Sequence, residues 1–135
     1  MDYKVLDMEK YYRKDIYRHF TMDCKCSVMI TSKIDVSELV AYSKQTGTKF
    51  YINFLYVLTK ALNTRDDYKM RYLYQEDKLV VFDKINTAHY VFHRDTETFT
   101  VVYTEFSEDY QAFYDRCCAD MEKAKTDPQL WSGRQ

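Results

Sequence analysis

The chain has 135 residues, of which 46% are hydrophobic and 17% aromatic, so it is long enough for one ordinary globular domain and too short for two. Its formal net charge is −1 and charged residues of both signs are interspersed, so binding to nucleic acid or to an anionic membrane surface is not expected. No apolar run could cross a bilayer and residues 1–10 lack a signal-peptide core, which predicts a cytoplasmic protein.

A helix and a strand are predicted at the start of the chain. Asp7 can act as the N-cap of a helix over residues 8–19, in which Tyr12 and Ile16 recur at helical spacing. Residues 27–34 are rich in β-branched side chains, which favours a strand. With only two Gly and one Pro in the chain, no segment has the composition of a linker.

Two further helices are predicted next. Asp35 and, three residues later, Glu38 form a pattern similar to a capping box, and Gly47 should end the helix that they begin. The third helix follows directly and carries an apolar stripe too wide for a helix lying loosely on a surface, so it should be well buried. The residues of that stripe are Tyr51, Phe54, Leu55, Leu58, Ala61 and Leu62.

The pattern changes to strands over residues 68–106. Runs dense in Tyr, Val, Phe and Thr are broken at 75–77, 83–86 and 94–95, and three breaks imply about four antiparallel strands. The order α-β-α-α-β-β-β-β-α is typical of an α+β fold in which helices pack on a mostly antiparallel sheet.

A last helix is predicted after Ser107, which can cap it. Pro128 should lie just past its end. The tail that follows contains Trp131, and it is either disordered or packs on a part of the fold that lies beyond the chain. The side chains expected on the buried face of this helix are Tyr110, Phe113, Tyr114, Cys117 and Met121.

The four cysteines form two close pairs, Cys24 with Cys26 and Cys117 with Cys118. Neither pair has the two-residue gap common in zinc knuckles, and no histidine is near either pair in sequence, so no metal site is predicted. In a reducing cytosol we expect all four to be small buried apolar side chains, with metal or disulfide chemistry as the alternative.

Several segments resemble the chloramphenicol acetyltransferase family in order and approximate spacing. The most specific is a Thr-Glu-Thr-Phe run after Val-Phe-His, because it has no generic structural reason to recur. The resemblance covers nearly the whole chain and implies a two-layer α+β sandwich, expected here to be incomplete at the C-terminus. The segments are Tyr12-Arg13-Lys14, Thr31-Ser32-Lys33-Ile34-Asp35, Lys49-Phe50-Tyr51, Val91-Phe92-His93 and Thr96-Glu97-Thr98-Phe99.

The resemblance also implies an acetyl transfer that this chain should not complete alone. Members of the family are trimers, in which acetyl-coenzyme A and chloramphenicol enter a tunnel between subunits from opposite ends. The general base is a histidine in a His-His-x-x-x-Asp-Gly motif, but His19, His89 and His93 are the only histidines here and none lies in that motif. The serine that helps to stabilise the tetrahedral intermediate also falls outside these residues. We therefore expect a single partial acetyltransferase domain over residues 1–135, because a missing general base alone costs about 10²–10⁴-fold in rate.

Four residues match family positions that line the chloramphenicol pocket, namely Phe20, Cys26, Phe99 and Val101. An apolar, aromatic wall is what an aryl ring in a cleft requires. Phe20 stands where several relatives have a tyrosine, so a hydroxyl contact is absent. Plain core packing is the alternative interpretation for each of the four.

Three further residues match family positions outside the drug wall. Lys49 and Tyr51 match positions near the coenzyme A end, where a cation can meet a phosphate, although a lysine at a helix start is usually solvated. Arg13 matches a structural arginine that pairs in relatives with the aspartate of the catalytic motif. Without that aspartate, Arg13 should reach solvent or pair with Asp15.

Other readings stay open. His93 ends a predicted strand beside Arg94, whose charge opposes protonation, so a structural or surface histidine is expected and a substitute base is the alternative. A non-catalytic binding or oligomerisation module that keeps the apolar wall is a second hypothesis for the chain. A dihydrolipoyl acyltransferase core shares the fold and the histidine motif, but the segments quoted above favour the drug family.

Overall fold

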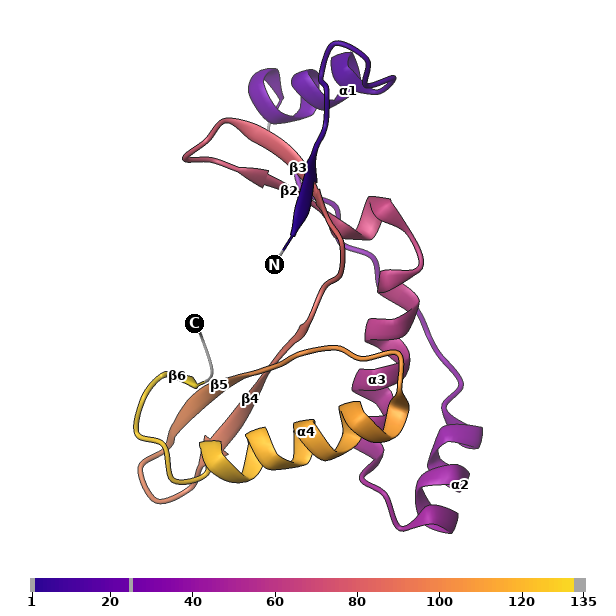
Figure 1. Cartoon of the computed structure of the whole chain (residues 1–135), viewed down its shortest axis with the longest axis vertical. Coiled ribbons are helices and arrows are strands. Elements are labelled where there is room, and N and C mark those ends of the chain that lie inside the picture. Colours follow the sequence, from indigo (N-terminus) through magenta and orange to yellow (C-terminus); the bar gives the residue numbers. More distant parts are fainter. Residues whose placement is uncertain (1, 25, 133–135) are drawn as a thin grey trace.

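The strands form two separate sheets in the part of the chain that the computed structural model describes, residues 2–24 and 26–132 (Figure 1). The first sheet has the order β1-β3-β2, with β1 Tyr3–Val5, β2 Met70–Leu73 and β3 Lys78–Phe82, and both of its pairs are antiparallel. The second has the order β4-β5-β6. Its strands are β4 Thr87–His93, β5 Thr98–Thr104 and β6 Trp131–Ser132, and only the β5–β6 pair is parallel.

The longer helices lie between and beside the two sheets. In Figure 1 the first sheet and α1 occupy one end of the long axis, the second sheet and α4 occupy the other, and α3 runs between them. Among the described residues no helix is long and apolar enough to span a membrane. The helices are α1 Lys14–Arg18, a π-helical turn η1 His19–Asp23, α2 Ser37–Thr46, α3 Phe50–Asn63, a 3₁₀ turn η2 Asp66–Lys69 and α4 Tyr110–Ala124.

The four strands expected from residues 68–106 are confirmed, as is the mostly antiparallel α+β architecture. They do not form one sheet, because the connection between β3 and β4 does not fold back as a hairpin. It is held to α3 by Asn63, whose Nδ2 donates to the Ile85 carbonyl at 3.0 Å and whose Oδ1 accepts from the Ile85 amide at 2.8 Å. Asn86 then accepts from the amide of Phe106 at 3.0 Å, which fixes the start of β4 beside the end of β5.

Three predictions for the first half of the chain need correction. The first helix begins at Lys14 rather than residue 8, because Asp7 accepts from the Glu9 amide at 3.0 Å in a local turn. The strand β1 was not predicted, and it is only three residues long. Residues 27–34 are extended but form no strand, since no described strand pairs with them. The end of α2 at Gly47, with φ of 67°, is as predicted.

The buried face of α3 is not the predicted apolar stripe. Tyr51 and Leu58 are 45% and 42% exposed. The helix is instead rotated so that Asn53, which is 1% exposed, enters the core as a hydrogen-bonded amide. The residues that α3 buries are Ile52, Asn53, Tyr56 and Thr59.

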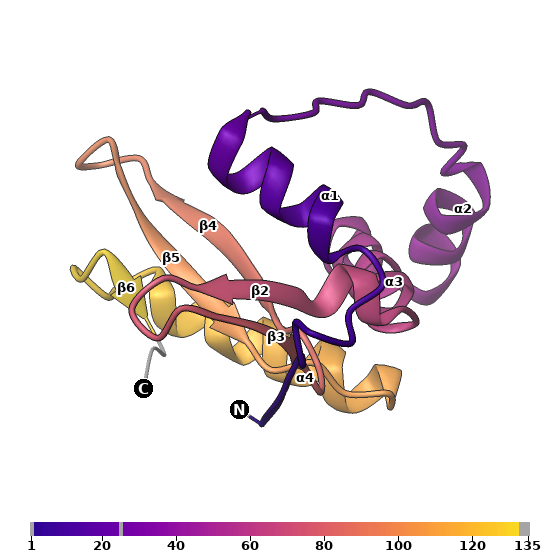
Figure 2. The same ribbon diagram turned by 90° about the horizontal axis from the view of Figure 1, so that it is seen from above.

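The predicted buried face of α4 is confirmed. Phe113 and Cys117 are 0% exposed, and Tyr110, Tyr114 and Met121 pack around them against α3. Farther along the helix, Met121 also contacts a second cluster that α4 forms on the sheet, made of Val91, Val102 and Ala124. Figure 2 shows α4 running along the β4–β5 sheet. The N-cap is Asp109, whose carboxylate accepts from the Ala112 amide at 3.1 Å, and not Ser107.

His89 is a buried histidine of β4 without hydrogen-bonding partners. Its side chain is 3% exposed, and among the described residues neither ring nitrogen has a partner. The ring meets the edge of Tyr51 from α3, with centroids 5.7 Å apart. Burial lowers the pKa of His89, and the Asp120 carboxylate on α4 opposes that effect only in part.

Replacing Asn53 with Ala should destabilise the fold markedly. The amide donates to Ser43 Oγ and to Thr48 Oγ1, both at 2.8 Å, and accepts from Tyr110 Oη at 2.6 Å, so its loss removes three hydrogen bonds from the core. We expect the free energy of unfolding, measured by urea denaturation, to fall by about 2–4 kcal/mol. Gln45→Ala, at an exposed amide of α2, is the control and should change it by less than about 0.5 kcal/mol. A loss below about 1 kcal/mol for Asn53→Ala would contradict this role.

His89 should make the fold acid-sensitive. Because its folded-state pKa lies below the unfolded value of 6.5, the unfolded chain binds the proton first as pH falls. Its contribution to stability is therefore complete above pH 6.5 and is lost as pH falls from there through the folded-state pKa, with a slope of at most about 1.4 kcal/mol per pH unit.

The matched variant is His89→Phe, which keeps an aromatic ring and removes the unpartnered nitrogens. At pH 7.5 we expect its free energy of unfolding to equal or exceed that of the parent by about 1–2 kcal/mol. Urea titrations of both proteins between pH 7.5 and 5 should show a smaller pH slope in the variant. Equal slopes would exclude His89 as the source.

Candidate functional site

Two of the four predicted wall residues lie side by side on β5. Phe99 and Val101 point to the same face, since they are two residues apart in a strand. Phe99 is 46% exposed and meets Tyr90 of β4 edge to face, with centroids 5.1 Å apart. Val101 is 4% exposed, and β6 pairs beside it through Trp131. On this face the accessible aromatic ring of Phe99 lies next to the buried aliphatic side chain of Val101.

The other two wall residues lie elsewhere in the chain. Phe20 is in η1, which continues directly from α1, and its ring is 47% exposed and packs against the edge of His19. Cys26 is exposed in the extended segment that follows. In Figure 1 α1 and the β4–β5 hairpin occupy opposite ends of the long axis, so the structure of the described residues does not bring η1, which follows α1, beside the β5 strand.

Lys49 and Tyr51 come together at the start of α3, next to α4. The Lys49 ammonium lies 4.0 Å from the Glu122 carboxylate of α4, and its backbone amide donates to Tyr114 Oη at 2.9 Å. The ring of Tyr51 contacts His89, and burial raises the pKa of the Tyr51 hydroxyl. Both side chains stay about half exposed, so they are accessible from solvent.

Arg13 reaches solvent at the start of α1. Its guanidinium lies 4.9 Å from the centre of the Tyr12 ring, a cation–π contact that needs no acidic partner. Within the described residues no ion pair joins it to Asp15.

The three described histidines lie in different surroundings. His19 is exposed and lies 3.4 Å from Asp23 on the same turn. His93 Nε2 is 2.8 Å from Thr100 Oγ1, and that hydroxyl is also within 3.0 Å of the carbonyl oxygens of Asp127 and Gln129. The Thr100 hydroxyl has one hydrogen and three possible acceptors, so whether His93 Nε2 donates to it or accepts from it depends on the histidine tautomer.

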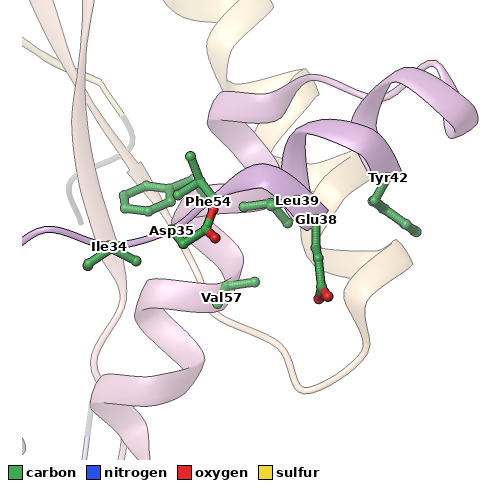
Figure 3. A pocket seen from close by; sticks show the side chains of 8 residues that line it. Ile34, Asp35, Glu38, Leu39, Tyr42, Phe54 and Val57 are labelled. Atoms are coloured by element: carbon green, nitrogen blue, oxygen red, sulfur yellow. The ribbon is translucent and has the colours of Figure 1, made fainter.

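A pocket of about 450 Å³ lies between α2, α3 and the segment before α2 (Figure 3). Its walls are mostly apolar, with the carboxylates of Asp35 and Glu38 at its polar side. None of the predicted site residues lines it. The signal that could have found it is the outward apolar face of α3. The lining residues are Ile34, Asp35, Val36, Glu38, Leu39, Tyr42, Phe54 and Val57.

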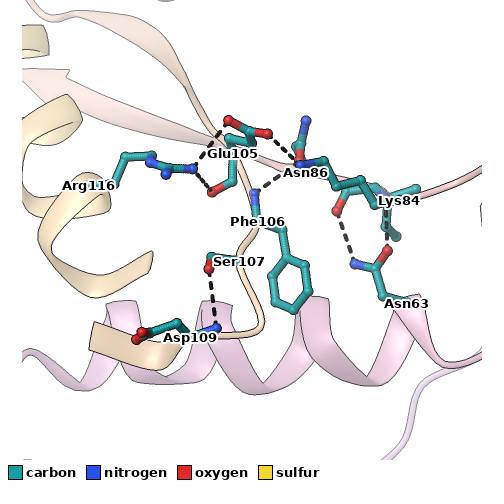
Figure 4. A network of polar contacts seen from close by, with 9 residues as sticks. Asn63, Lys84, Asn86, Glu105, Phe106, Ser107, Asp109 and Arg116 are labelled. Atoms are coloured by element: carbon teal, nitrogen blue, oxygen red, sulfur yellow. Dashed lines mark hydrogen bonds and ion pairs between the residues drawn. The ribbon is translucent and has the colours of Figure 1, made fainter. Parts of the chain in front are cut away.

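A second pocket, of about 380 Å³, lies beside the connection from β3 to β4. Figure 4 shows the polar network there, in which Glu105 pairs with Lys84 and, at 3.3 Å, with Arg116. The hydrogen bond from Lys84 is the main reason that the pKa of Glu105 is lowered. The charged groups of this network pair with one another, which indicates a structural role.

The cysteines behave differently from one another. Burial raises the pKa of the Cys117 thiol to about 11, which keeps it protonated, as expected of a small core residue. The prediction that all four are buried is wrong for Cys24 and Cys26, which are exposed. In residues 2–24 and 26–132, no group of three or more His, Cys, Asp or Glu side chains is placed to hold a metal ion.

Comparison with known proteins gives consistent matches. A family profile described as "Chloramphenicol acetyltransferase" matches residues 1–132. The chain is 29% identical over 131 residues to "Chloramphenicol acetyltransferase 3" of Escherichia coli, covering 97% of this chain and 61% of that protein. It is 30% identical over 114 residues to "Chloramphenicol acetyltransferase" of Clostridium perfringens, covering 84% and 52%.

A solved chloramphenicol acetyltransferase has the same fold, with a TM-score of 0.87 at 19% identity over 96% of this chain and 60% of the other. The chain spans between half and about three fifths of the length of these proteins. Because the family profile covers all but the last three of the 135 residues, this chain belongs to the chloramphenicol acetyltransferase family.

Proposed function

We propose that this chain forms one partial domain of a chloramphenicol O-acetyltransferase, an enzyme that moves an acetyl group from acetyl-coenzyme A to a hydroxyl of the drug. Family membership supports the reaction class. We assign drug binding to the β4–β5 sheet because Phe99 and Tyr90 form an accessible aromatic face there. A half-exposed ring pair on a rigid sheet can stack against the aryl group of the drug.

The drug site is completed by a neighbouring subunit. Phe99 and Val101 of β5 form one wall, and Phe20 with Cys26 forms another, which follows α1 at the opposite end of the long axis from the β4–β5 hairpin. A homotrimer, as the family resemblance implies, brings the Phe20 side of one copy towards the Phe99 side of the next. The exposure of both rings, 47% and 46%, supports surfaces that are covered only on association.

Acetyl-coenzyme A approaches the start of α3. Lys49 offers a cation there, and its pair with Glu122 at 4.0 Å is long and exposed, so a phosphate can displace the carboxylate at small cost. Tyr51 supplies a neighbouring ring and hydroxyl. Arg13 has a structural role at the other end of the chain, where its stack on Tyr12 leaves the guanidinium ready for a carboxylate from another segment.

The alternative is a non-catalytic module of the same fold that binds a small aromatic ligand or oligomerises. The placement of the histidines favours this reading over an active enzyme for the 135 residues alone. His93 Nε2 is hydrogen-bonded to Thr100 Oγ1, and His89 is buried with no hydrogen-bonding partner among the described residues. Activity and drug binding, measured separately, distinguish the two.

The purified chain should not acetylate chloramphenicol at an ordinary enzymatic rate. Without a positioned base the hydroxyl keeps its proton, and the loss is on the order of 10²–10⁴-fold for that step. The assay is release of free thiol from acetyl-coenzyme A in the presence and absence of the drug, for the parent and for His93→Ala. Enzymatic turnover that disappears in His93→Ala would show that His93 is the base and contradict the proposal.

The chain should still bind chloramphenicol weakly through the β5 face. We expect saturable binding by calorimetry, with a dissociation constant about tenfold larger for Phe99→Ala, which corresponds to about 1.4 kcal/mol. Tyr74→Ala, at an aromatic side chain that is 87% exposed in the turn between β2 and β3, should leave binding unchanged. Equal loss in both variants, or no heat up to the solubility limit of the drug, would remove the drug wall from the proposal.

A further inference from the structure

The His89 ring is buried at the junction of β4, α3 and α4. Along β4 the buried Thr87, His89 and Val91 alternate with exposed residues, so these three side chains lie on the side of the sheet that faces α4. The His89 side chain is 3% exposed, and neither ring nitrogen has a hydrogen-bonding partner among the described residues. Because a buried polar group without partners costs about 1–3 kcal/mol, a histidine at this position needs an explanation beyond packing.

On the α3 side His89 contacts Tyr51. The two rings meet at an angle of 70° with their centroids 5.7 Å apart. Tyr51 lies in the first turn of α3 and is 45% exposed, so part of its ring packs on His89 and the rest is open to solvent. The thiol of Cys117, which interacts with Tyr51 from α4, has a pKa of about 11 and carries no charge at neutral pH. His89 is therefore the inner support of a ring that a ligand can reach from outside.

The groups that surround His89 suit a neutral ring. Its partner across the strand pair is the apolar Val102 of β5. Burial raises the pKa of the Tyr51 hydroxyl, which is therefore neutral as well. On α4 the charged group that acts on His89 is the Asp120 carboxylate, which accepts a hydrogen bond from Thr104 Oγ1 at 2.8 Å. Protonation would place a cation beside that carboxylate without a hydrogen bond of its own.

We propose that neutral His89 is a positioning residue for Tyr51, and that protonation of His89 weakens the binding of coenzyme A at the start of α3. A buried histidinium needs hydrogen bonds in place of its lost hydration. The Asp120 carboxylate can supply one, so the charged ring is drawn towards α4 and away from Tyr51. The inference rests on the proposed function, because it deepens the assignment of Lys49 and Tyr51 to the coenzyme A end. His89 itself touches no substrate and acts only through Tyr51.

Preference for the neutral ring sets the sign of the pH dependence. When coenzyme A binds only the neutral form, its apparent dissociation constant rises as pH falls through the pKa of His89. Because burial keeps that pKa below 6.5, the rise at pH 5.5 is at most about tenfold. By reciprocity, bound coenzyme A should lower the pKa of His89 further. Attraction between the phosphates and a histidinium would instead raise that pKa, so the two explanations predict opposite signs.

Nuclear magnetic resonance of the full chain measures this sign directly. The ring protons of His89, assigned by their absence from His89→Phe, are titrated with and without saturating coenzyme A. We expect the pKa of His89 to be lower in the complex. The exposed His19 on η1 is the internal reference, and its ring protons should titrate in the same way with and without the ligand. An equal or higher pKa of His89 in the complex would overturn the proposal.

Two variants separate the ring of His89 from its charge. His89→Phe keeps a ring beneath Tyr51 and cannot be protonated, so by calorimetry it should bind coenzyme A within about twofold of the parent at pH 7.5 and lose less affinity at pH 5.5. His89→Ala removes the ring and should raise the dissociation constant at pH 7.5 by about fivefold. The phosphate monoester of coenzyme A titrates near about pH 6 with every variant, so comparison between variants cancels its effect. His19→Phe is the matched control and should follow the parent at both pH values.

The outcomes separate this inference from the proposed function. A parent chain that binds no coenzyme A at pH 7.5 would remove the cofactor end of the proposed function, and the role of His89 with it. Binding that weakens equally with pH in the parent and in His89→Phe would overturn the role of His89 alone, as would unchanged affinity in a folded His89→Ala. Where His89→Ala does not fold, the comparison of the parent with His89→Phe and the resonance titration still decide.

Discussion

The packing of the two sheets and the longer helices depends on the buried apolar side chains along α4. Phe113 and Cys117, both fully buried, pack against α3 on one side, while Ala124 lies on the β4–β5 sheet on the other. α4 is therefore the element that holds the second sheet against α3. The first sheet is attached less directly, through η2 at the end of α3 and the β3–β4 connection that Asn63 holds.

The buried side of α4 determines which surfaces of the chain remain exposed to solvent. Because α4 covers one face of the β4–β5 sheet, the opposite face keeps Tyr90, Phe92 and Phe99 in contact with solvent. Likewise, rotation of α3 to bury Asn53 leaves Tyr51 and Leu58 outside. The proposed ligand and partner surfaces are thus the faces that the chain's own core does not use, which is consistent with a chain that spans only part of the length of its relatives.

The sequence correctly predicted those elements that depend mainly on neighbouring residues in the chain. Turn residues and strand-like composition predicted β2 to β5, and helical spacing predicted the buried face of α4. The face of α3 could not be chosen in this way, because its apolar stripe competes with a buried amide whose partners come from α2 and α4. Residues 27–34 have the composition of a strand, but a strand also needs a neighbour, and sequence composition does not supply one.

In the candidate site, too, some features follow from local sequence and others from long-range packing. Strand periodicity is enough to place Phe99 and Val101 on one face, whereas the distance from Phe20 to that face is set by the long-range path of the chain. A general base is more demanding than a wall, because its proton-accepting nitrogen must be free as well as near. His93 sits close to the most specific motif, and its Nε2 is 2.8 Å from Thr100 Oγ1, which also lies within 3.0 Å of two backbone carbonyl oxygens. Strand periodicity is therefore enough to predict one side of a wall, whereas predicting a base also requires knowing which hydrogen bonds occupy its ring nitrogens.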